Sequence, residues 1–152
     1  MSRAFTNEDH FVGDLPDRPV SEHPNYVTPR GLELIEAALN DARRNYGQAQ
    51  AAGDREALAS AGRDLRYWNA RRASAQIVSP DPAINTVQFG STVTIVRDDG
   101  REQTFGIVGE DEADPAHGTI SHASPLARAL FGKAVGDVIT AGKDEAEITA
   151  IK

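Results

Sequence analysis

The chain has 152 residues, of which 39% are hydrophobic and 26% are charged, a composition typical of a soluble protein with one compact domain or two small ones. It has no cysteine, which excludes disulfides, thiolate metal sites and cysteine nucleophiles, and its net charge of −7 argues against non-specific binding to nucleic acid. No apolar run approaches the ~20 residues that span a bilayer, and the first residues lack the apolar stretch of a secretory signal, so we expect a cytoplasmic protein with no membrane partner.

Residues 1–27 form the first segment of distinct composition. They carry three prolines, several acidic residues and little apolar periodicity. Such a segment buries too little apolar surface to offset the entropy of ordering, so its composition predicts an extended or disordered tail.

Residues 28–78 predict a helical hairpin. Thr28 and Pro29 are a typical helix start, Gly53 ends the first helix, and Asp54 is placed to cap the second. Both helices carry a thin apolar seam with the 3, 4, 3, 4, 3 spacing of a heptad repeat. The seam consists of Leu32, Ile35, Leu39, Ala42, Tyr46 and Ala49, and then of Leu58, Ala61, Leu65, Trp68, Arg72 and Ala75. Two helices joined by so tight a turn are antiparallel neighbours, which predicts a coiled coil.

A proline-rich linker over residues 79–84 separates this hairpin from a second domain, residues 85–152. The apolar period there changes to two, which is typical of strands. We expect strands over residues 92–96, 103–108, 119–121, 138–140 and 146–151, and one short helix over residues 126–131. The whole chain is therefore predicted to be an α+β protein, with a helical hairpin followed by a small, mostly antiparallel β domain.

The sequence holds no complete catalytic or metal-binding constellation. His117 and His122 could provide two metal ligands, but no third ligand nearby completes a site. The acidic run from Glu110 to Asp114 lacks the ligand spacing of an EF-hand, so a solvated loop or a partner-facing patch is the preferred interpretation. A phosphate-binding loop and a nucleophile elbow are also missing from the sequence.

Two carboxylates stand at the predicted tip of the hairpin. Asp54 and Glu56 follow Gly53 directly at the start of the second helix. Helix capping by Asp54 and a favourable helix-dipole position for Glu56 explain both acids. The alternative is a carboxylate pair that the hairpin delivers into a deep site of a partner.

Arginines dominate the basic residues of the hairpin. Six of them fall within thirty residues and define a candidate basic face: Arg43, Arg44, Arg63, Arg66, Arg71 and Arg72. Arginines along a helix usually lie with their stems over the apolar seam and their charges in water. On an otherwise acidic protein they could equally meet an acidic partner or a phosphate backbone.

Several motifs of the second domain resemble those of the bacterial Gre-type (GreA/GreB) transcription elongation factors. Residues 86–95 read Thr-Val-Gln-Phe-Gly-Ser-Thr-Val-Thr-Ile, and residues 107–114 read Ile-Val-Gly-Glu-Asp-Glu-Ala-Asp. Residues 124–133 read Ser-Pro-Leu-Ala-Arg-Ala-Leu-Phe-Gly-Lys, and Gly-Asp-Val follows at residues 136–138. The similarity runs from about residue 84 to the end of the sequence, and the segment from Tyr26 to Leu32 is similar to the first-helix opening of the same family.

The resemblance implies a coiled coil followed by an FKBP-like domain that docks on RNA polymerase at the rim of its secondary channel. The coiled coil of such factors enters the channel, where tip acids help to hold a catalytic Mg²⁺ in the polymerase's own active site during cleavage of backtracked RNA. The protein would then need no cofactor of its own, would act as a monomer, and would approach the RNA 3′ end or DNA only inside the complex. The docking residues implied by the matching motifs are Asp111, Glu112, His122, Ser124 and Pro125.

The hairpin departs from the family pattern. Each arm is shorter by roughly ten residues, or about 15 Å. The family tip has Asp after Gly and Glu three residues later, whereas here the third residue after Asp54 is Ala57 and Glu56 comes one position early. Residues three apart share a helix face and residues two apart do not. The protein could therefore stimulate cleavage through Asp54 and Glu56, or could occupy the channel without doing so, as short-hairpin Rnk-type relatives suggest.

Two further classes remain open. The FKBP-like fold suggests peptidyl-prolyl isomerase activity, which needs a pocket of aromatic rings, and the second domain has only Phe89, Phe105 and Phe131. The other class is a structural module that binds an acidic or helical partner through its arginine face.

Overall fold

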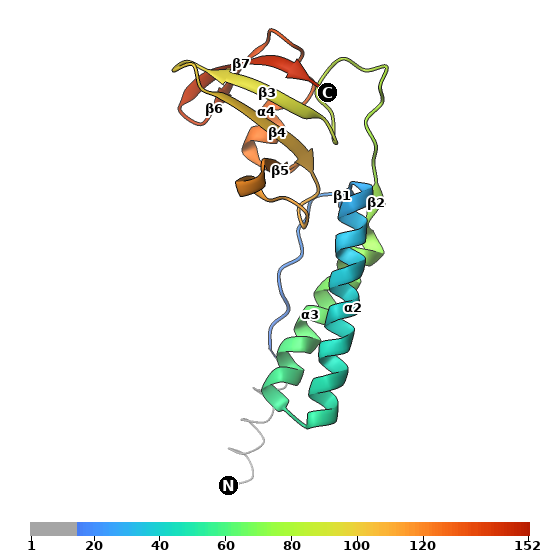
Figure 1. The fold of residues 1–152 in the computed structure, drawn as a ribbon. Coiled ribbons are helices and arrows are strands. Elements are labelled where there is room, and N and C mark those ends of the chain that lie inside the picture. The colour runs from blue at the N-terminus through green and yellow to red at the C-terminus, as the bar shows by residue number, and fades with distance from the viewer. Residues whose placement is uncertain (1–14) are drawn as a thin grey trace. The chain divides into compact units, whose positions relative to one another are not determined.

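The computed structural model describes residues 15–152, so the first fourteen residues of the predicted tail lie outside the described residues. The chain divides into two compact units. The first contains residues 15–24 and Glu33–Ala75, and the second contains Asn25–Leu32 and Gln76–Lys152 (Figure 1). The opening of the first long helix thus belongs to the second unit.

The predicted helical hairpin is confirmed. Helix α2 spans Pro29–Ala52 and helix α3 spans Arg55–Ser74. Gly53 ends α2 with a φ of 67°, a left-handed conformation that glycine adopts without steric cost. Asp54 begins α3, because its carboxylate accepts a hydrogen bond from the Ala57 backbone N–H at 3.1 Å. At 1.5 Å per residue the two arms are about 36 and 30 Å long.

The seam between the helices is built mainly from small residues. Ile35 and Leu39 are buried on α2 together with Ala42 and Ala49, while Ala61 and Gly62 are buried on α3. A Cβ at Gly62 would lie 3.5 Å from the Tyr46 ring, an ordinary van der Waals distance, so Gly62 lies close to this ring. The prediction that Arg72 lies in the seam is wrong, since Arg72 is exposed and pairs with Glu36 at 3.2 Å. Its neighbour Arg71 is buried instead, with 1% of its surface exposed.

The second arm is shorter than the sequence predicts. It ends at Ser74 rather than near residue 78, because strand β2, Gln76–Ile77, pairs in parallel with strand β1, Tyr26–Val27. The Gln76 N–H donates to the Asn25 carbonyl at 2.9 Å and the Val78 N–H donates to the Val27 carbonyl at 3.1 Å. The part of the predicted tail nearest to the helix is therefore hydrogen-bonded to the chain that leaves α3.

The second unit contains a five-stranded sheet. Its strands are β3 (Thr92–Arg97), β4 (Glu102–Val108), β5 (Thr119–Ser121), β6 (Val138–Ala141) and β7 (Asp144–Ile151). The order across the sheet is β5-β4-β3-β7-β6. All pairs are antiparallel except β4 with β5, which is parallel, so the sheet is mixed and mostly antiparallel, as predicted. A short 3-10 helix, η1 (Pro115–His117), makes the crossover between those two strands.

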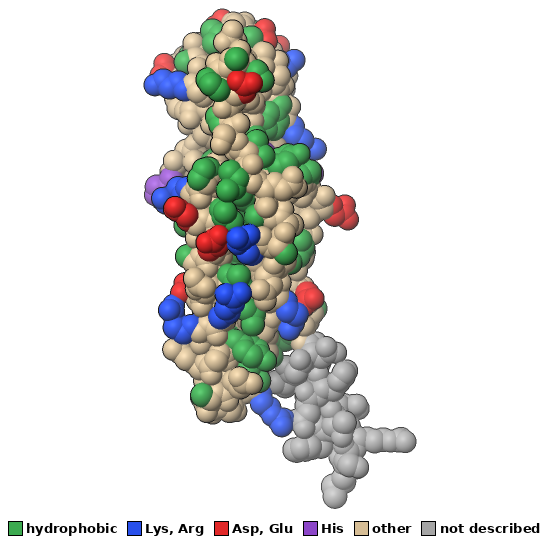
Figure 2. Space-filling view, turned by 90° about the vertical axis from the view of Figure 1, so that its right-hand side faces the viewer, with side chains coloured by type: hydrophobic (Ala, Val, Ile, Leu, Met, Phe, Trp, Pro, Cys, Tyr) green, Lys and Arg blue, Asp and Glu red, His purple; other side chains and the backbone are tan. Residues whose placement is uncertain are grey.

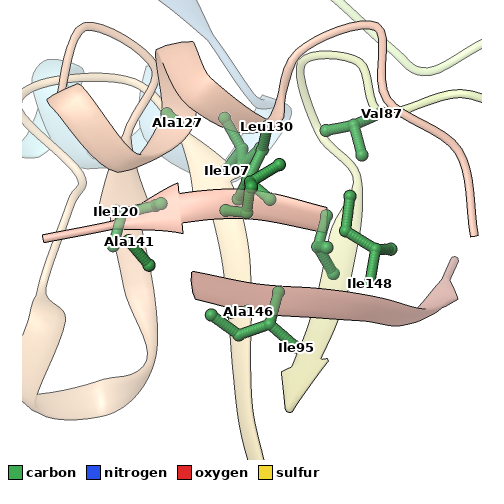
Figure 3. Close-up of a cluster of buried hydrophobic side chains, with 11 residues drawn as sticks. Val87, Ile95, Ile107, Ile120, Ala127, Leu130, Ala141, Ala146 and Ile148 are labelled. Atoms are coloured by element: carbon green, nitrogen blue, oxygen red, sulfur yellow. The ribbon is translucent and has the colours of Figure 1, made fainter. Parts of the chain in front are cut away.

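One short helix, α4 (Pro125–Leu130), covers the core face of this sheet. Figure 3 shows Ala127 and Leu130 of α4 above Ile107, Ile95 and Ile148 of the strands. All five residues are completely or almost completely buried. The alternation of buried and exposed residues along β6 and β7 matches the predicted period of two. The prediction of an α+β fold is confirmed.

The segment after β2 is exposed, but hydrogen bonds within the second unit hold it in place. The side-chain amide of Gln88 accepts from the Asp81 N–H at 3.0 Å and donates to the Asp81 carbonyl at 2.9 Å. Gly90 has a φ of 88°, and a Cβ there would lie 2.8 Å from Pro80. Glycine at position 90 thus permits the close approach of the predicted linker.

Candidate docking surface

The sheet topology brings the predicted docking residues together. Strands β4 and β5 are parallel neighbours with Val108 opposite Ser121. The loops that follow them therefore leave the same edge of the sheet side by side, a placement that parallel strands impose. The first loop carries Asp111 and Glu112, and the second carries His122 and Ser124. We call these two loops, residues 109–114 and 122–125, the docking surface.

Glu112 is hydrogen-bonded to the start of α2 within the second unit. The Thr28 hydroxyl donates to Glu112 Oε2 at 2.6 Å and accepts from the Gly31 N–H at 3.0 Å. A Cβ at Gly31 would lie only 2.7 Å from Glu112 Oε2, so glycine makes room for the carboxylate. A carboxylate beside the first turn of a helix is also favoured by the helix dipole. Glu112 thus has a structural role that the sequence interpretation missed.

His122 belongs to a cluster of three rings. It is buried, and its ring centroid lies 5.4 Å from that of Tyr26 and 5.6 Å from that of Phe89. Gly109 is buried beside this cluster, where a Cβ would lie 2.6 Å from the Tyr26 carbonyl oxygen. The β1 backbone therefore packs directly against the loop of residues 109–114. His122 is buried beneath the docking surface and is not exposed on it.

Ser124 and Pro125 begin helix α4. The Ser124 hydroxyl accepts from the Ala127 N–H at 3.2 Å, and Pro125 occupies the first helical turn with an exposed side chain. Asp111 is half-buried in the neighbouring loop. Of the five predicted residues, Pro125 is exposed and Asp111 is half-buried, so solvent reaches both of them.

The loop acids and histidines do not assemble a metal site in the described part of the chain. Within residues 15–152 no group of three or more His, Asp or Glu side chains is arranged to hold an ion. His117 Nδ1 lies 2.6 Å from Asp114 Oδ2 on an exposed turn, while His122 is in the ring cluster. The two histidines therefore have different partners.

The tip carboxylates lie two positions apart at the start of α3. Asp54 is the cap and Glu56 lies in the first turn, and both are exposed. Because they are two residues apart, helix geometry points them in different directions. The capping interpretation of Asp54 is the one that the structure supports by a measured contact.

The six arginines do not form one continuous basic face. Arg71 is buried, and Arg63 is half-buried. Arg66 pairs with Asp17 at 2.5 Å, Arg72 pairs with Glu36, and Arg44 pairs with Asp41. On the face in Figure 2, blue and red side chains are interspersed over the hairpin with wide neutral areas between them. Arg43 is exposed on α2.

The second unit has a cavity near α4, but its walls do not suit proline isomerisation. It measures about 540 Å³ and includes Arg97, Ile120, Leu126 and Thr140. Its lining contains no aromatic ring among the described residues. Phe89 is in the ring cluster, and Phe105 and Phe131 pack against the hydrophobic core. The structure therefore gives the isomerase alternative no support.

Comparison with known proteins identifies the family. Residues 72–152, just over half of the chain, match the family described as "Transcription elongation factor, GreA/GreB, C-term". The chain is also 35% identical over 156 aligned positions to transcription elongation factor GreB of Neisseria meningitidis serogroup B, with 87% of this chain and 96% of that protein covered. The chain belongs to the GreA/GreB family. Its role is that of a Gre-type transcription elongation factor.

Other relatives are similar over different shares of the chain. Transcription elongation factor GreA of Alkalilimnicola ehrlichii is 46% identical over 88 residues, which cover 53% of this chain and 55% of that protein. The crystal structure of GreA factor homolog 1 (Gfh1) of Thermus thermophilus matches at 22% identity and a TM-score of 0.42, covering 86% of this chain and 99% of that one. The 156 positions aligned with GreB exceed the 152 residues of this chain, so GreB has residues that this Gre-family protein lacks.

The helices of residues 15–152 were compared with the length and apolarity that a bilayer span requires. None of these helices is both long enough and apolar enough to cross a bilayer.

Proposed function

We propose that this Gre-family protein binds RNA polymerase at the secondary channel through the docking surface and modulates elongation with its hairpin. The observation that carries the proposal is the placement of the two family motifs. The acidic motif follows β4 and the Ser-Pro motif follows β5, and the parallel pairing of these strands puts both at one sheet edge. The protein would act as a cytoplasmic monomer and would meet the RNA 3′ end or DNA only inside the complex.

The hairpin geometry favours occupation of the channel over stimulation of cleavage. Cleavage of backtracked RNA would use the polymerase's own Mg²⁺, with carboxylates of the factor aimed at that ion. Here Asp54 is engaged by the Ala57 N–H, and Glu56 lies two positions further on. With arms of about 36 and 30 Å, the protein is better suited to exclude other channel-binding factors than to supply a carboxylate pair.

Binding is tested first, with purified polymerase and full-length protein. Charge reversal by Asp111→Lys should weaken binding at least tenfold, because electrostatic complementarity steers such contacts. The matched control is Glu147→Lys, an equal charge change at an exposed position of β7. Circular dichroism checks that both variants keep their fold. Equal affinities of the two variants would contradict the docking assignment.

Transcript cleavage in a stalled, backtracked elongation complex separates the two mechanisms. We expect the protein alone to leave the RNA intact and to suppress cleavage stimulated by an added cleavage-competent Gre factor. RNA shortening by the protein alone, abolished by Asp54→Ala, would instead establish carboxylate delivery by the short hairpin. An absence of both effects would contradict action at the channel.

A further inference from the structure

An extended segment, residues 15–24, lies along helix α3 within the first unit (Figure 1). We call it the strap. Two of its residues form ion pairs with α3, one through a basic side chain of the strap and one through an acidic side chain of the strap. Arg18 donates to Asp64 at 3.2 Å, and Arg66 donates to Asp17 at 2.5 Å.

Arg18 also covers an aromatic pair. Its guanidinium carbon lies 3.9 Å from the centre of the Tyr67 ring and 5.7 Å from that of Trp68. The two rings meet edge to face with their centroids 4.9 Å apart. A guanidinium at such distances is attracted by the negative face of the ring. The strap thus meets a patch of α3 formed by Asp64, Arg66, Tyr67 and Trp68.

The sequence of the strap prepares it for this extended conformation. Pro16 and Pro19 flank the two contacting residues, and Pro24 follows before β1. Proline fixes its own φ and disfavours the helical region for the residue before it, which here is Arg18. The unfolded strap therefore has less entropy to lose when it docks.

The contacts of the strap are nevertheless exposed enough to be reversible. The side chains of Arg18 and Asp64 are 37% and 42% exposed, and those of Arg66 and Asp17 are 52% and 69% exposed. Ion pairs with this solvent access are weak individually and are screened by salt. The apolar side chains of the strap add little buried surface to these weak ion pairs, because in residues 15–24 Leu15 is half-buried and Val20 is exposed.

We propose that the strap is a releasable, autoinhibitory cover. It must leave the α3 patch of Asp64, Arg66, Tyr67 and Trp68 before a partner protein can contact that surface of the hairpin. The partner is the polymerase, because a hairpin that enters the secondary channel places its helix faces against the channel wall; this step rests on the proposed function. Release of the strap itself does not depend on the proposed function.

The protein carries its own reporter of release. Trp68 is the single tryptophan of the chain and lies under Arg18. In the full-length protein, Arg18→Ala should shift the Trp68 emission to longer wavelength and raise its quenching by acrylamide, with the helical circular dichroism unchanged. Arg101→Ala is the matched control, because it removes a comparable exposed pair, Arg101 with Asp99 at 2.6 Å, in the second unit. Raising the salt concentration from 0.05 to 0.5 M should reproduce the effect in the wild type.

A charge exchange distinguishes strap release from general damage to the hairpin. Asp17→Arg and Arg66→Asp each place like charges together and should release the strap. The double variant D17R/R66D restores opposite charges and should return the Trp68 signal toward that of the wild type. Unchanged Trp68 signals in Arg18→Ala and in both single reversals would overturn the strap. If the Trp68 signal of the double variant does not recover, the inference that ion pairs hold the strap on α3 would be overturned.

Polymerase binding tests the autoinhibitory step. Arg18→Ala changes the strap and leaves the covered patch intact, so affinity should rise by the reciprocal of the open fraction, about tenfold if the strap is open one tenth of the time. Release without tighter binding would overturn autoinhibition while leaving the proposed function in place. Absence of binding by wild type and released variants alike would overturn the proposed function and the polymerase as the competing partner, and the Trp68 result would still decide whether the strap exists.

Discussion

Removal of the Glu112 carboxylate should destabilise the start of helix α2. The Thr28 hydroxyl joins this carboxylate to the Gly31 N–H, through contacts of 2.6 and 3.0 Å. Hydrogen bonds to charged groups contribute about 1.5–3 kcal/mol when buried, and the half-buried positions of both side chains reduce this to about 1 kcal/mol. Glu112→Ala should therefore cost about 1 kcal/mol. Thr28→Ala should cost about 2 kcal/mol, because the helix cap is lost as well.

Amide hydrogen exchange is the suitable assay, since the chain has two units and global unfolding need not follow a single transition. The Gly31 N–H donates to Thr28 Oγ1 and the Leu32 N–H donates to the Thr28 carbonyl at 3.0 Å, so both amides report on this turn. A loss of about 1 kcal/mol should lower their protection about fivefold. Amides of β3 and β7 should keep their protection.

A double-mutant cycle provides the decisive comparison. Thr28→Ala and Glu112→Ala should show a coupling of about 1 kcal/mol. Gly31→Ala gives an independent route, because the added Cβ would lie 2.7 Å from Glu112 Oε2 and displace the carboxylate. In that background Glu112→Ala should be nearly neutral. Strict additivity in both cycles would refute the inference that the carboxylate acts through Thr28.

Three further predictions concern other parts of the chain. Leu130→Ala should destabilise the second unit by about 2–5 kcal/mol in denaturant unfolding, because the side chain is fully buried in the core. Asp54→Ala should cost the hairpin about 1 kcal/mol by loss of the bond from the Ala57 N–H, seen as a lower thermal midpoint of Trp68 fluorescence. Hydrogen bonds from the backbone and then the side chain of Arg101 hold the pKa of Asp99 below its ordinary value, so its contribution to stability is present above the unfolded-state pKa and is lost as the pH falls through the lowered one. Arg101→Ala should raise the Asp99 pKa in an NMR titration, since the side-chain bond and the charge are lost, and an unchanged pKa would contradict this cause.

Local sequence signals were sufficient for most of the fold. The period-3.5 seam and the Gly53-Asp54 boundary located both helices, and the change to a period of two located the strands. These features depend on neighbours along the chain. The β1–β2 pairing depends on contacts across about fifty residues, and strands of two residues carry no periodicity. The parallel pairing of β4 with β5 was not predicted, because a sequence rich in hairpin turns favours antiparallel neighbours.

Arg71 and Arg72 show why the arginines were harder to interpret. The heptad pattern placed position 72 in the seam, yet the structure buries Arg71 and leaves Arg72 in an exposed pair with Glu36. A shift of one residue is 100° around a helix, so a small drift from the heptad at the end of an arm exchanges the buried and exposed positions. Salt-bridge partners such as Asp17 come from outside the helix and leave no periodic signal in α3.

The proposed docking surface includes residues that also make contacts inside the second unit, and this affects how its variants must be interpreted. Glu112 is bonded to Thr28 and His122 lies against Tyr26 and Phe89, so changes at either position disturb the second unit itself. Pro125 is exposed at the first turn of α4, and the rest of the cap depends on Ser124. A binding defect from Asp111→Lys or from a Pro125 substitution would measure contact with the proposed partner once circular dichroism shows that the variant keeps its fold. The same defect from Glu112→Ala measures contact only after hydrogen exchange has shown that the α2 start is intact, because loss of this hydrogen bond would weaken binding even if the carboxylate never touched the polymerase.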